Sequence, residues 1–309
     1  MTMAHAPGKV ILFGEHAVVY SQPAIAVPVR EVQAQVLLEA GLPDQGTLVA
    51  VPDLERRFLL READQDDPLA RIVRLALRAV RQKRDPDLTL TITSSIPIAR
   101  GMGSGAAVST AIVRALAKHF DFWLPSRAVS ELVYQTEVLY HGTPSGIDNT
   151  VVAFEKPVFF VKEEGWEFFW VDKPFLLAIA DSGIESSTKE VVGDLRRRYE
   201  ADADRYQPLF YRAGEIARMA RSAIERGDQP ALGRLMDENH ELLREMGVSC
   251  PELDRMVLAA REGGALGAKL SGAGWGGNMI ALVTEETRGR VNIMLRLAGA
   301  TRVIFSRVR

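Results

Sequence analysis

The stretch PIARGMGSGAA, residues 97–107, is a glycine-rich turn that joins a predicted strand to a predicted helix. The strand before it, residues 88–93, reads LTLTIT, and this alternation of apolar and polar residues is typical of a half-buried strand. Gly101, Gly103 and Gly105 allow positive φ angles and remove side chains that would block close approach to the backbone. The free N–H groups at the start of a helix favour an anion, and we expect a polyphosphate there.

A glycine-rich turn of this kind has two further interpretations. One is a tight connection between strand and helix that binds nothing. The other is a dinucleotide-binding fingerprint, because Gly101, Gly103 and Ala106 fit its spacing loosely. Its acidic residue would be Asp121, which must then end a second parallel strand, whereas residues 115–120 have a helical pattern. We therefore predict a phosphate loop of a different kind.

The composition is that of a soluble globular protein with about two domains. The chain has 309 residues, of which 47% are hydrophobic and 25% charged. The net charge is −2, so the chain does not have the excess of basic residues that is typical of nucleic-acid-binding proteins. Cys250 is the only cysteine, which excludes intramolecular disulfides and thiolate zinc clusters. Glu15 and His16 interrupt the one apolar stretch near the start, so we expect no signal peptide, no membrane span and a cytoplasmic protein. A homodimer is compatible with the sequence.

The pattern of apolar residues predicts an α+β protein with two layered domains, residues 1–172 and 173–309. In the first domain we expect strands at 10–13, 24–29, 32–39, 88–93, 151–154 and 158–161, and helices near 69–84, 106–119 and 126–140. In the second we expect strands at 175–180, 267–270, 279–283 and 303–305, and helices near 189–205, 209–226, 229–246, 251–261 and 286–297.

A second motif, HAPGKVILFGEH, occupies residues 5–16. It places Lys9 before an apolar strand and Glu15 and His16 after it. Lysines usually lie on the surface, and Lys9 can be read in that way. Because it follows Pro-Gly and precedes a central strand, it can instead supply a fixed positive charge near a phosphate or a carboxylate.

A third motif, HGTPSGIDN at residues 141–149, is rich in turn-forming residues and can be a simple connector. Its Asp148 can instead be a general base held by Lys9. Glu137, on the helix before this loop, lies at the edge of an apolar face. A carboxylate near the core needs a partner, and both Mg²⁺ beside phosphates and a salt bridge meet that need.

A fourth motif, KLSGAGWGGN at residues 269–278, contains four glycines in six residues between two predicted strands. Its backbone must pass close to another group. Packing of the two domains and closure over a ligand are the two interpretations of that close approach.

Together these motifs resemble the GHMP kinases, named for galactokinase, homoserine kinase, mevalonate kinase and phosphomevalonate kinase. The resemblance extends from His5 to about Val283, with the family's motifs in order. Residues 7–19 and 141–149 are most similar to the mevalonate kinase branch. The resemblance implies an N-terminal domain like that of ribosomal protein S5, a ferredoxin-like C-terminal domain, and ATP- and Mg²⁺-dependent phosphorylation of the C5 hydroxyl of mevalonate in isoprenoid precursor synthesis.

Matching positions imply a role for each site residue. Asp148 corresponds to the catalytic aspartate and Lys9 to the lysine that pairs with it. Glu137 corresponds to the Mg²⁺-binding glutamate. Glu15, His16 and Thr188 correspond to positions that hold the substrate. The ATP phosphate loop corresponds to Pro97, Arg100, Gly101, Met102, Gly103, Ser104, Gly105, Ala106 and Ala107.

The chain departs from the family pattern at two places. Gly105 stands where the family commonly has a serine whose hydroxyl binds the metal, so that Ser104 or a water must take its place. Trp275 stands where a glycine is common and could narrow the site. Alternative readings are another GHMP small-molecule kinase, acting on phosphomevalonate or a sugar, and a non-catalytic regulatory protein on the same scaffold.

Overall fold

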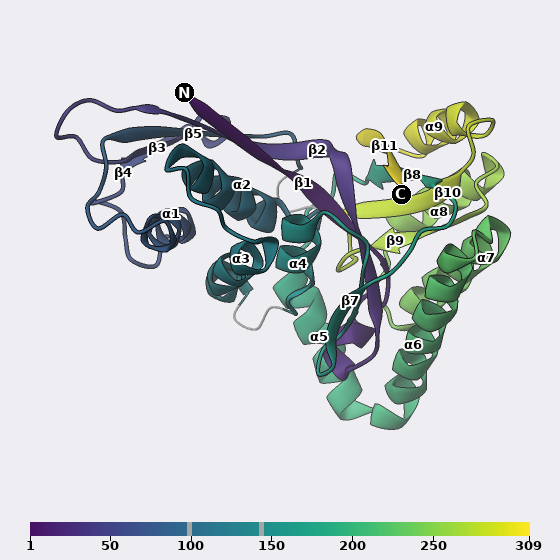
Figure 1. Cartoon of the computed structure of the whole chain (residues 1–309). Helices are drawn as coiled ribbons and strands as arrows, with labels where there is room; N and C mark the ends of the chain where they lie inside the picture. Colours follow the sequence, from purple (N-terminus) through teal and green to yellow (C-terminus); the bar gives the residue numbers. More distant parts are fainter. Residues whose placement is uncertain (98–100, 142–144) are drawn as a thin grey trace. The chain divides into compact units, whose positions relative to one another are not determined.

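The computed structural model describes residues 1–97, 101–141 and 145–309. For residues 139–141 it describes the backbone alone. Contacts between Cα atoms divide the chain into two units (Figure 1). The first unit comprises Met1–Lys9, Val32–Pro97 and Gly103–Glu155, and the second comprises Val10–Glu31, Ile98–Met102 and Lys156–Arg309. The units do not test the predicted domain boundary after residue 172, which stays a prediction.

The first unit contains a sheet in the order β4-β3-β5-β2. Its strands are β3 (Leu48–Val51), β4 (Arg56–Leu59), β5 (Leu88–Ser94) and the C-terminal half of β2 (Ala24–Ala40), and a short 3-10 helix, Pro52–Leu54, joins β3 to β4. Strand β1 (Thr2–Phe13) also pairs with β2. Leu88, Leu90 and Ile92 of β5 are buried, which confirms the predicted half-buried strand.

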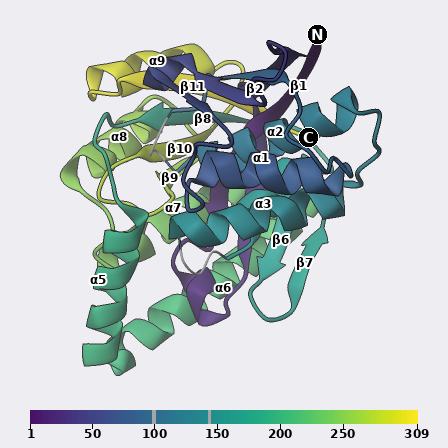
Figure 2. The same ribbon diagram turned by 90° about the vertical axis from the view of Figure 1, so that its left-hand side faces the viewer.

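Four helices accompany this sheet: α1 (Pro68–Ala79), α2 (Ser104–His119), α3 (Ser126–His141) and α4 (Ile147–Phe154). The first three pack against one another, and Figure 2 shows α1 and α3 side by side. Helix α1 begins where Asp67 accepts a hydrogen bond from the Ala70 N–H at 2.8 Å, with Pro68 in the first turn. Helix α4 packs against α2 and α3.

The prediction of a strand at 151–154 is wrong, because these residues form the second half of α4. Val151, Val152 and Ala153 are all buried. A helix that is buried on all sides gives the same short apolar run as a buried strand, so periodicity does not separate the two. Gly146, at φ 89°, starts this helix, and the Thr150 hydroxyl donates to the Gly146 carbonyl at 2.7 Å.

The second unit contains a four-stranded antiparallel sheet in the order β11-β8-β10-β9. Its strands are β8 (Phe175–Asp181), β9 (Gly267–Ser271), β10 (Asn278–Val283) and β11 (Arg302–Val308). Helices separate β8 from β9 and β10 from β11, which gives the β-α-β-β-α-β order of a ferredoxin-like domain. The same unit holds the 3-10 helix Ala17–Tyr20 and a pair of strands, β6 (Val158–Val161) and β7 (Gly165–Phe168), and β6 pairs with the start of β2.

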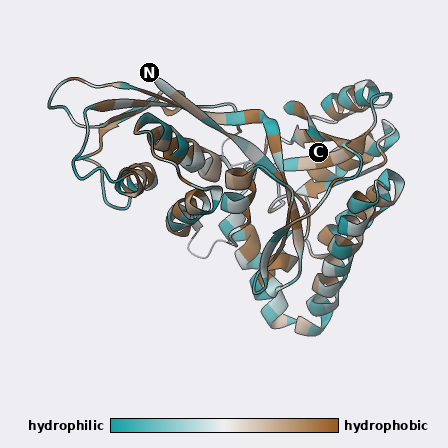
Figure 3. Ribbon diagram, in the orientation of Figure 1, coloured by the Kyte–Doolittle hydropathy of each residue, from teal (hydrophilic) through white to brown (hydrophobic). Residues whose placement is uncertain are grey.

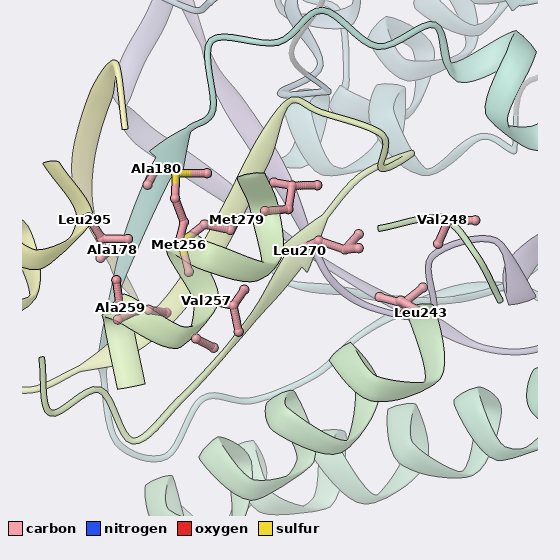
Figure 4. Packing of buried hydrophobic residues seen from close by; sticks show 14 of the residues in the cluster. Ala178, Ala180, Leu243, Val248, Met256, Val257, Ala259, Leu270, Met279 and Leu295 are labelled. Atoms are coloured by element: carbon pink, nitrogen blue, oxygen red, sulfur yellow. The ribbon is translucent and has the colours of Figure 1, made fainter. Parts of the chain in front are cut away.

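Five helices belong to the second unit: α5 (Thr188–Ala201), α6 (Ala203–Glu225), α7 (Gln229–Glu245), α8 (Pro251–Glu262) and α9 (Arg288–Leu297). Hydrophobic and hydrophilic residues alternate along α6 and α7, which pack side by side (Figures 1 and 3). Figure 4 shows where Ala178 of β8, Leu270 of β9 and Met279 of β10 meet side chains from α7, α8 and α9. This core supports the strands that lead into and out of the fourth motif.

The remaining differences from prediction concern short strands and joins. Residues 24–29 and 32–39 form one strand, β2, and Pro28 lies outside the residues that pair with β6 and β5. The four-residue strands β3, β4 and β7 were not predicted, because their runs are short and two of the residues of β4 are arginines. Helix α6 begins at residue 203, before Pro208, because Asp202 caps it. Among the described residues, no helix combines the length and the apolar character needed to cross a membrane.

Candidate active site

In the first unit the predicted phosphate loop leads into α2 through Gly103, which has a φ of 69°. A Cβ atom at Gly103 would lie 2.9 Å from Cγ of Lys9, closer than real Cβ atoms approach. Glycine is therefore required here both by the backbone angle and by the space. The first N–H groups of α2 have no partner within the helix and face its N-terminal end. The other predicted loop residues of this unit are Ser104 and Gly105, which are half-buried, and Ala106 and Ala107, which are buried.

Lys9 and Asp148, the two predicted catalytic residues, form an ion pair in which Lys9 Nζ lies 2.9 Å from Asp148 Oδ1. The Lys9 side chain is only 5% exposed, whereas that of Asp148 is 30% exposed. Asp148 lies in the first turn of α4, where the helix dipole favours a negative charge. The pair thus combines a buried, fixed cation with a carboxylate that solvent can reach.

Glu137 of α3 lies close enough to this pair to feel both of its charges. The pKa of Glu137 is raised to about 8, first by burial and then by the negative charge of Asp148, while the Lys9 ammonium acts in the opposite direction. The side chain is 4% exposed. Lys9, Glu137, Asp148 and Gly103 are therefore brought together within one unit, and we call them the Lys9–Asp148 cluster.

A second link holds α4 against the helix that carries Glu137. The side-chain amide of Asn149, the residue after Asp148, donates to the carbonyl oxygen of Ser130 at 3.2 Å and to its hydroxyl at 2.9 Å. Ser130 lies on α3, about two turns before Glu137. Asn149 thereby fixes the start of α4, and with it Asp148, relative to α3.

The chemistry of the Lys9–Asp148 cluster fits a hard divalent cation. Two carboxylates, one of them largely removed from water and disfavoured as an anion, form the kind of oxygen donor set that Mg²⁺ prefers. Mg²⁺ commonly binds to only one or two carboxylates and keeps several waters. The described part of the chain holds no group of three His, Cys, Asp or Glu side chains arranged as a metal site.

In the second unit Glu15 forms an ion pair with Lys269 of β9, and both side chains are almost completely buried. Lys269 Nζ also donates to the carbonyl oxygen of Leu270 at 2.7 Å and lies 5.9 Å from the centroid of the Phe13 ring. Burial lowers the pKa of Lys269, and the Glu15 carboxylate acts in the opposite direction. The Ser271 hydroxyl donates to the Ile11 carbonyl at 2.7 Å, so β9 holds the second motif at two points.

His16 lies beside this pair in the left-handed region, with a φ of 62°. Its Nε2 lies 2.8 Å from the Ala273 carbonyl oxygen, which requires the proton on Nε2. Burial lowers the pKa of His16 to about 4, so the ring is neutral at pH 7 and its Nδ1 is an acceptor. Nδ1 is buried and has no hydrogen-bond partner among the described residues.

A small depression of the second unit contains two further predicted residues, Gly101 of the phosphate loop and Thr188 at the start of α5. Ser186, Ser271 and glycines of the fourth motif also line it. Trp275 does not project freely over this motif, because its Nε1–H donates to the Gly247 carbonyl at 3.0 Å. The full lining is Gly101, Ser186, Thr188, Ser271, Ala273, Gly274, Gly276 and Gly277.

The remaining predicted loop residues occupy different surroundings. Pro97 follows β5 and is half-buried, and Met102 is 1% exposed. Arg100 lies outside the described residues, as do residues 142–144 of the third motif.

Comparisons with known proteins identify the family of this chain. Residues 70–156 match the model of the GHMP kinases N terminal domain, and residues 220–292 match that of the GHMP kinases C terminal domain. The chain is 34% identical to the mevalonate kinase of Pyrococcus abyssi, over 98% of this chain and 95% of that protein. The chain belongs to the GHMP kinase family. It is therefore an enzyme of the kinase type, and membership in this family implies the use of ATP.

Two further proteins extend the comparison of this GHMP kinase. It is 35% identical to the mevalonate kinase of Thermococcus onnurineus, over 98% of this chain and 95% of that protein. Its fold matches the crystal structure of L. major mevalonate kinase in complex with R-mevalonate with a TM-score of 0.86 and 29% identity, over 100% of this chain and 96% of that one. The predicted family and fold class are thus confirmed.

Lys269 is the residue of these clusters to which the sequence assigned no role. It opens the fourth motif, but a lysine beside a glycine-rich turn usually lies on the surface. The available signal is its position between Ala268 and Leu270 in an apolar strand, where a charged residue must be paired if the strand is buried. The pairing with Glu15, 254 residues away in the chain, follows only from the fold.

The Glu15–Lys269 ion pair predicts a large and asymmetric effect on stability. We expect Lys269→Met to lower the free energy of unfolding by about 3–5 kcal/mol, because it leaves the Glu15 carboxylate buried without its countercharge. The double variant Lys269→Met/Glu15→Leu should recover much of this loss, since it removes both charges. Urea unfolding at pH 7, followed by circular dichroism, measures both effects.

The control for this experiment is Lys162→Met, which removes an exposed lysine of the same unit and should change stability by less than about 0.5 kcal/mol. A Lys269→Met variant as stable as the native protein would show that the pair contributes nothing.

Proposed function

We propose that this GHMP kinase transfers the γ-phosphoryl group of ATP to the C5 hydroxyl of mevalonate and gives 5-phosphomevalonate, a step of isoprenoid precursor synthesis. The contact between Lys9 and Asp148 carries the proposal of chemistry, because it pairs a solvent-accessible carboxylate with a fixed cation beside a phosphate loop. Mevalonate is proposed as the acceptor because the similar proteins are named mevalonate kinases. A cytoplasmic location and a homodimer stay predictions.

In phosphoryl transfer, the protein mainly positions the reacting groups and neutralises the charge of the phosphates. Asp148 accepts the proton of the acceptor hydroxyl as a general base. Lys9 stabilises the alkoxide oxygen that develops as this proton leaves, and its rigid, buried position keeps it beside Asp148. The two side chains act together, because each charge is stabilised by the other.

The first turn of α2 would hold the ATP phosphates, and Glu137 and Ser104 would hold Mg²⁺ next to them. A bound Mg²⁺ supplies positive charge at the phosphates during transfer. Glu137 suits this role because its burial disfavours the anion until a cation is present. Ser104, the first residue of α2, offers the hydroxyl that Gly105 lacks, and a water is the alternative ligand.

We assign Glu15, His16 and Thr188 to substrate binding. Thr188 is exposed at the depression of the second unit, where its hydroxyl can bind a polar acceptor. Neutral His16 has one unused acceptor atom, Nδ1, which suits a hydroxyl group of the substrate. Glu15 contributes through Lys269, with which it forms the buried ion pair.

A panel of acceptors tests the proposed substrate. Purified enzyme with Mg²⁺ and ATP is offered mevalonate, phosphomevalonate, galactose or homoserine, and ADP release is followed in a coupled assay. We expect the highest kcat/KM for mevalonate, and ³¹P NMR should identify a phosphate monoester at C5. Faster turnover of any other acceptor would replace mevalonate as the substrate while leaving the kinase family unchanged.

The role of Asp148 predicts the effect of its amide variant. Asp148→Asn keeps the size of the side chain but cannot accept the proton, so kcat should fall by at least ~10²-fold. ATP binding, measured by isothermal titration calorimetry, should be nearly unchanged. Asp66→Asn, at an exposed aspartate of the same unit, serves as the control. Near-native turnover in Asp148→Asn would remove this residue from the mechanism.

The role of Glu137 predicts a change in metal dependence. In Glu137→Gln we expect the Mg²⁺ concentration for half-maximal rate to rise about 10-fold or more, the scale seen when support of a metal site is lost. The melting temperature should not fall, because with a pKa of about 8 the Glu137 carboxyl is mostly neutral at pH 7 and the neutral amide has nearly the same shape. Glu131→Gln, an exposed glutamate on the same helix, is the control. A lower melting temperature with unchanged Mg²⁺ dependence would instead assign Glu137 a purely structural salt bridge.

A further inference from the structure

Arg114 joins three segments of the first unit, since it lies on α2 and its guanidinium group binds both β1 and the end of α4. Its Nη1 donates to the His5 carbonyl oxygen of β1 at 3.0 Å and to Glu155 Oε1 at 2.6 Å. Its Nη2 donates to the Ala153 carbonyl oxygen at 3.0 Å. Ala153 belongs to the last turn of α4, and Glu155 is the capping residue that ends this helix with a φ of 53°.

Each of these three segments carries a different part of the Lys9–Asp148 cluster at its other end. Strand β1 carries Lys9, four residues after His5. Helix α4 carries Asp148, five residues before Ala153. Helix α2, on which Arg114 itself lies, begins at the phosphate loop after Gly103. One side chain therefore joins the lysine, the aspartate and the phosphate loop through rigid elements.

We propose that Arg114 is a positioning residue for phosphoryl transfer, which sets Lys9 and Asp148 relative to the N-terminus of α2. The proposal rests on the proposed function, in which these three parts act together. His5, which Arg114 contacts, lies about 13 Å from Lys9 along β1, and Ala153, which it also contacts, lies about 8 Å from Asp148 along α4. Arg114 therefore acts on these residues through the elements that carry them.

The physical reason lies in the geometry of the guanidinium group. Its planar fork makes hydrogen bonds in fixed directions, so two carbonyls and a carboxylate held by it cannot slide independently. The Ala153 carbonyl belongs to the last turn of a helix, where carbonyls lack partners within the helix, and Arg114 supplies one. A shift of α4 along its own axis would carry Asp148 with it, and displacement of a reacting group by 1 Å can cost ~10²-fold in rate.

The test compares Arg114→Ala with the native enzyme in kcat, in both KM values and in ATP affinity by calorimetry. We expect kcat to fall between ~10- and 100-fold, with nearly unchanged KM for ATP and for the acceptor, because substrates still bind but the reacting groups are displaced. Arg114 is partly exposed, so millimolar guanidinium ion can enter the vacated space and should restore part of kcat. Arg114→Lys keeps the charge but loses the fork, and we expect an intermediate kcat.

The matched control is Arg127→Met, which removes an arginine of the same unit whose ion pair with Glu131 is exposed and 3.1 Å long. It should leave kcat unchanged and gain nothing from guanidinium. If Arg114→Ala does not fold, Arg114→Lys and Glu155→Gln carry the same comparison, since each removes part of the contact.

Two results would overturn the proposal. One is an Arg114→Ala enzyme with native kcat. The other is a loss of activity that follows the loss of folded protein, raises both KM values and shows no rescue by guanidinium, which would give Arg114 a structural role only. If the native enzyme does not phosphorylate mevalonate, the proposed function fails, but the ratio of variant to native kcat on its true acceptor still decides the role of Arg114.

Discussion

The contact between Lys9 and Asp148 constrains every other part of the first unit's functional cluster. A lysine side chain that is 5% exposed must have a countercharge nearby, and Asp148 supplies it. Lys9 can lie there only because Gly103 has no side chain in its path. The same two charges then act on Glu137, whose pKa reflects burial first and the Asp148 charge second. Loop, lysine and carboxylates are therefore parts of one electrostatic arrangement.

In the second unit, too, a buried lysine needs a countercharge. Glu15 supplies it to Lys269, and both side chains are almost completely buried. Stability alone does not account for such a pair, because two apolar side chains of similar size are often as stable or more so. The pair does give the second motif a defined position, since Lys269 and Ser271 of β9 bind it at two points. A neutral His16 beside the pair completes a polar environment suited to recognition of a small polar ligand.

The motifs were predictable from the sequence because each combines turn-forming residues with a charged side chain, and the alternating strand 88–93 and the helix after the loop have clear periods. The run at 151–154 was not, because burial on all sides removes the periodicity that separates helix from strand. Lys269 and Arg114 were missed for a different reason. Their partners, Glu15 and His5, are more than 100 residues away in the chain, and only the folded topology brings them together.

The glycines of the phosphate loop illustrate the same limit most sharply. In the sequence, Gly103 and Gly105 look equivalent. In the structure, Gly103 has a positive φ and no room for a Cβ atom, whereas Gly105 lies inside α2, where an L-residue adopts the helical angles without strain. The backbone angle at residue 105 therefore does not demand glycine. A hydroxyl is absent there for a reason other than backbone geometry, and this leaves Ser104 or a water to complete the shell of a metal ion that needs few protein ligands.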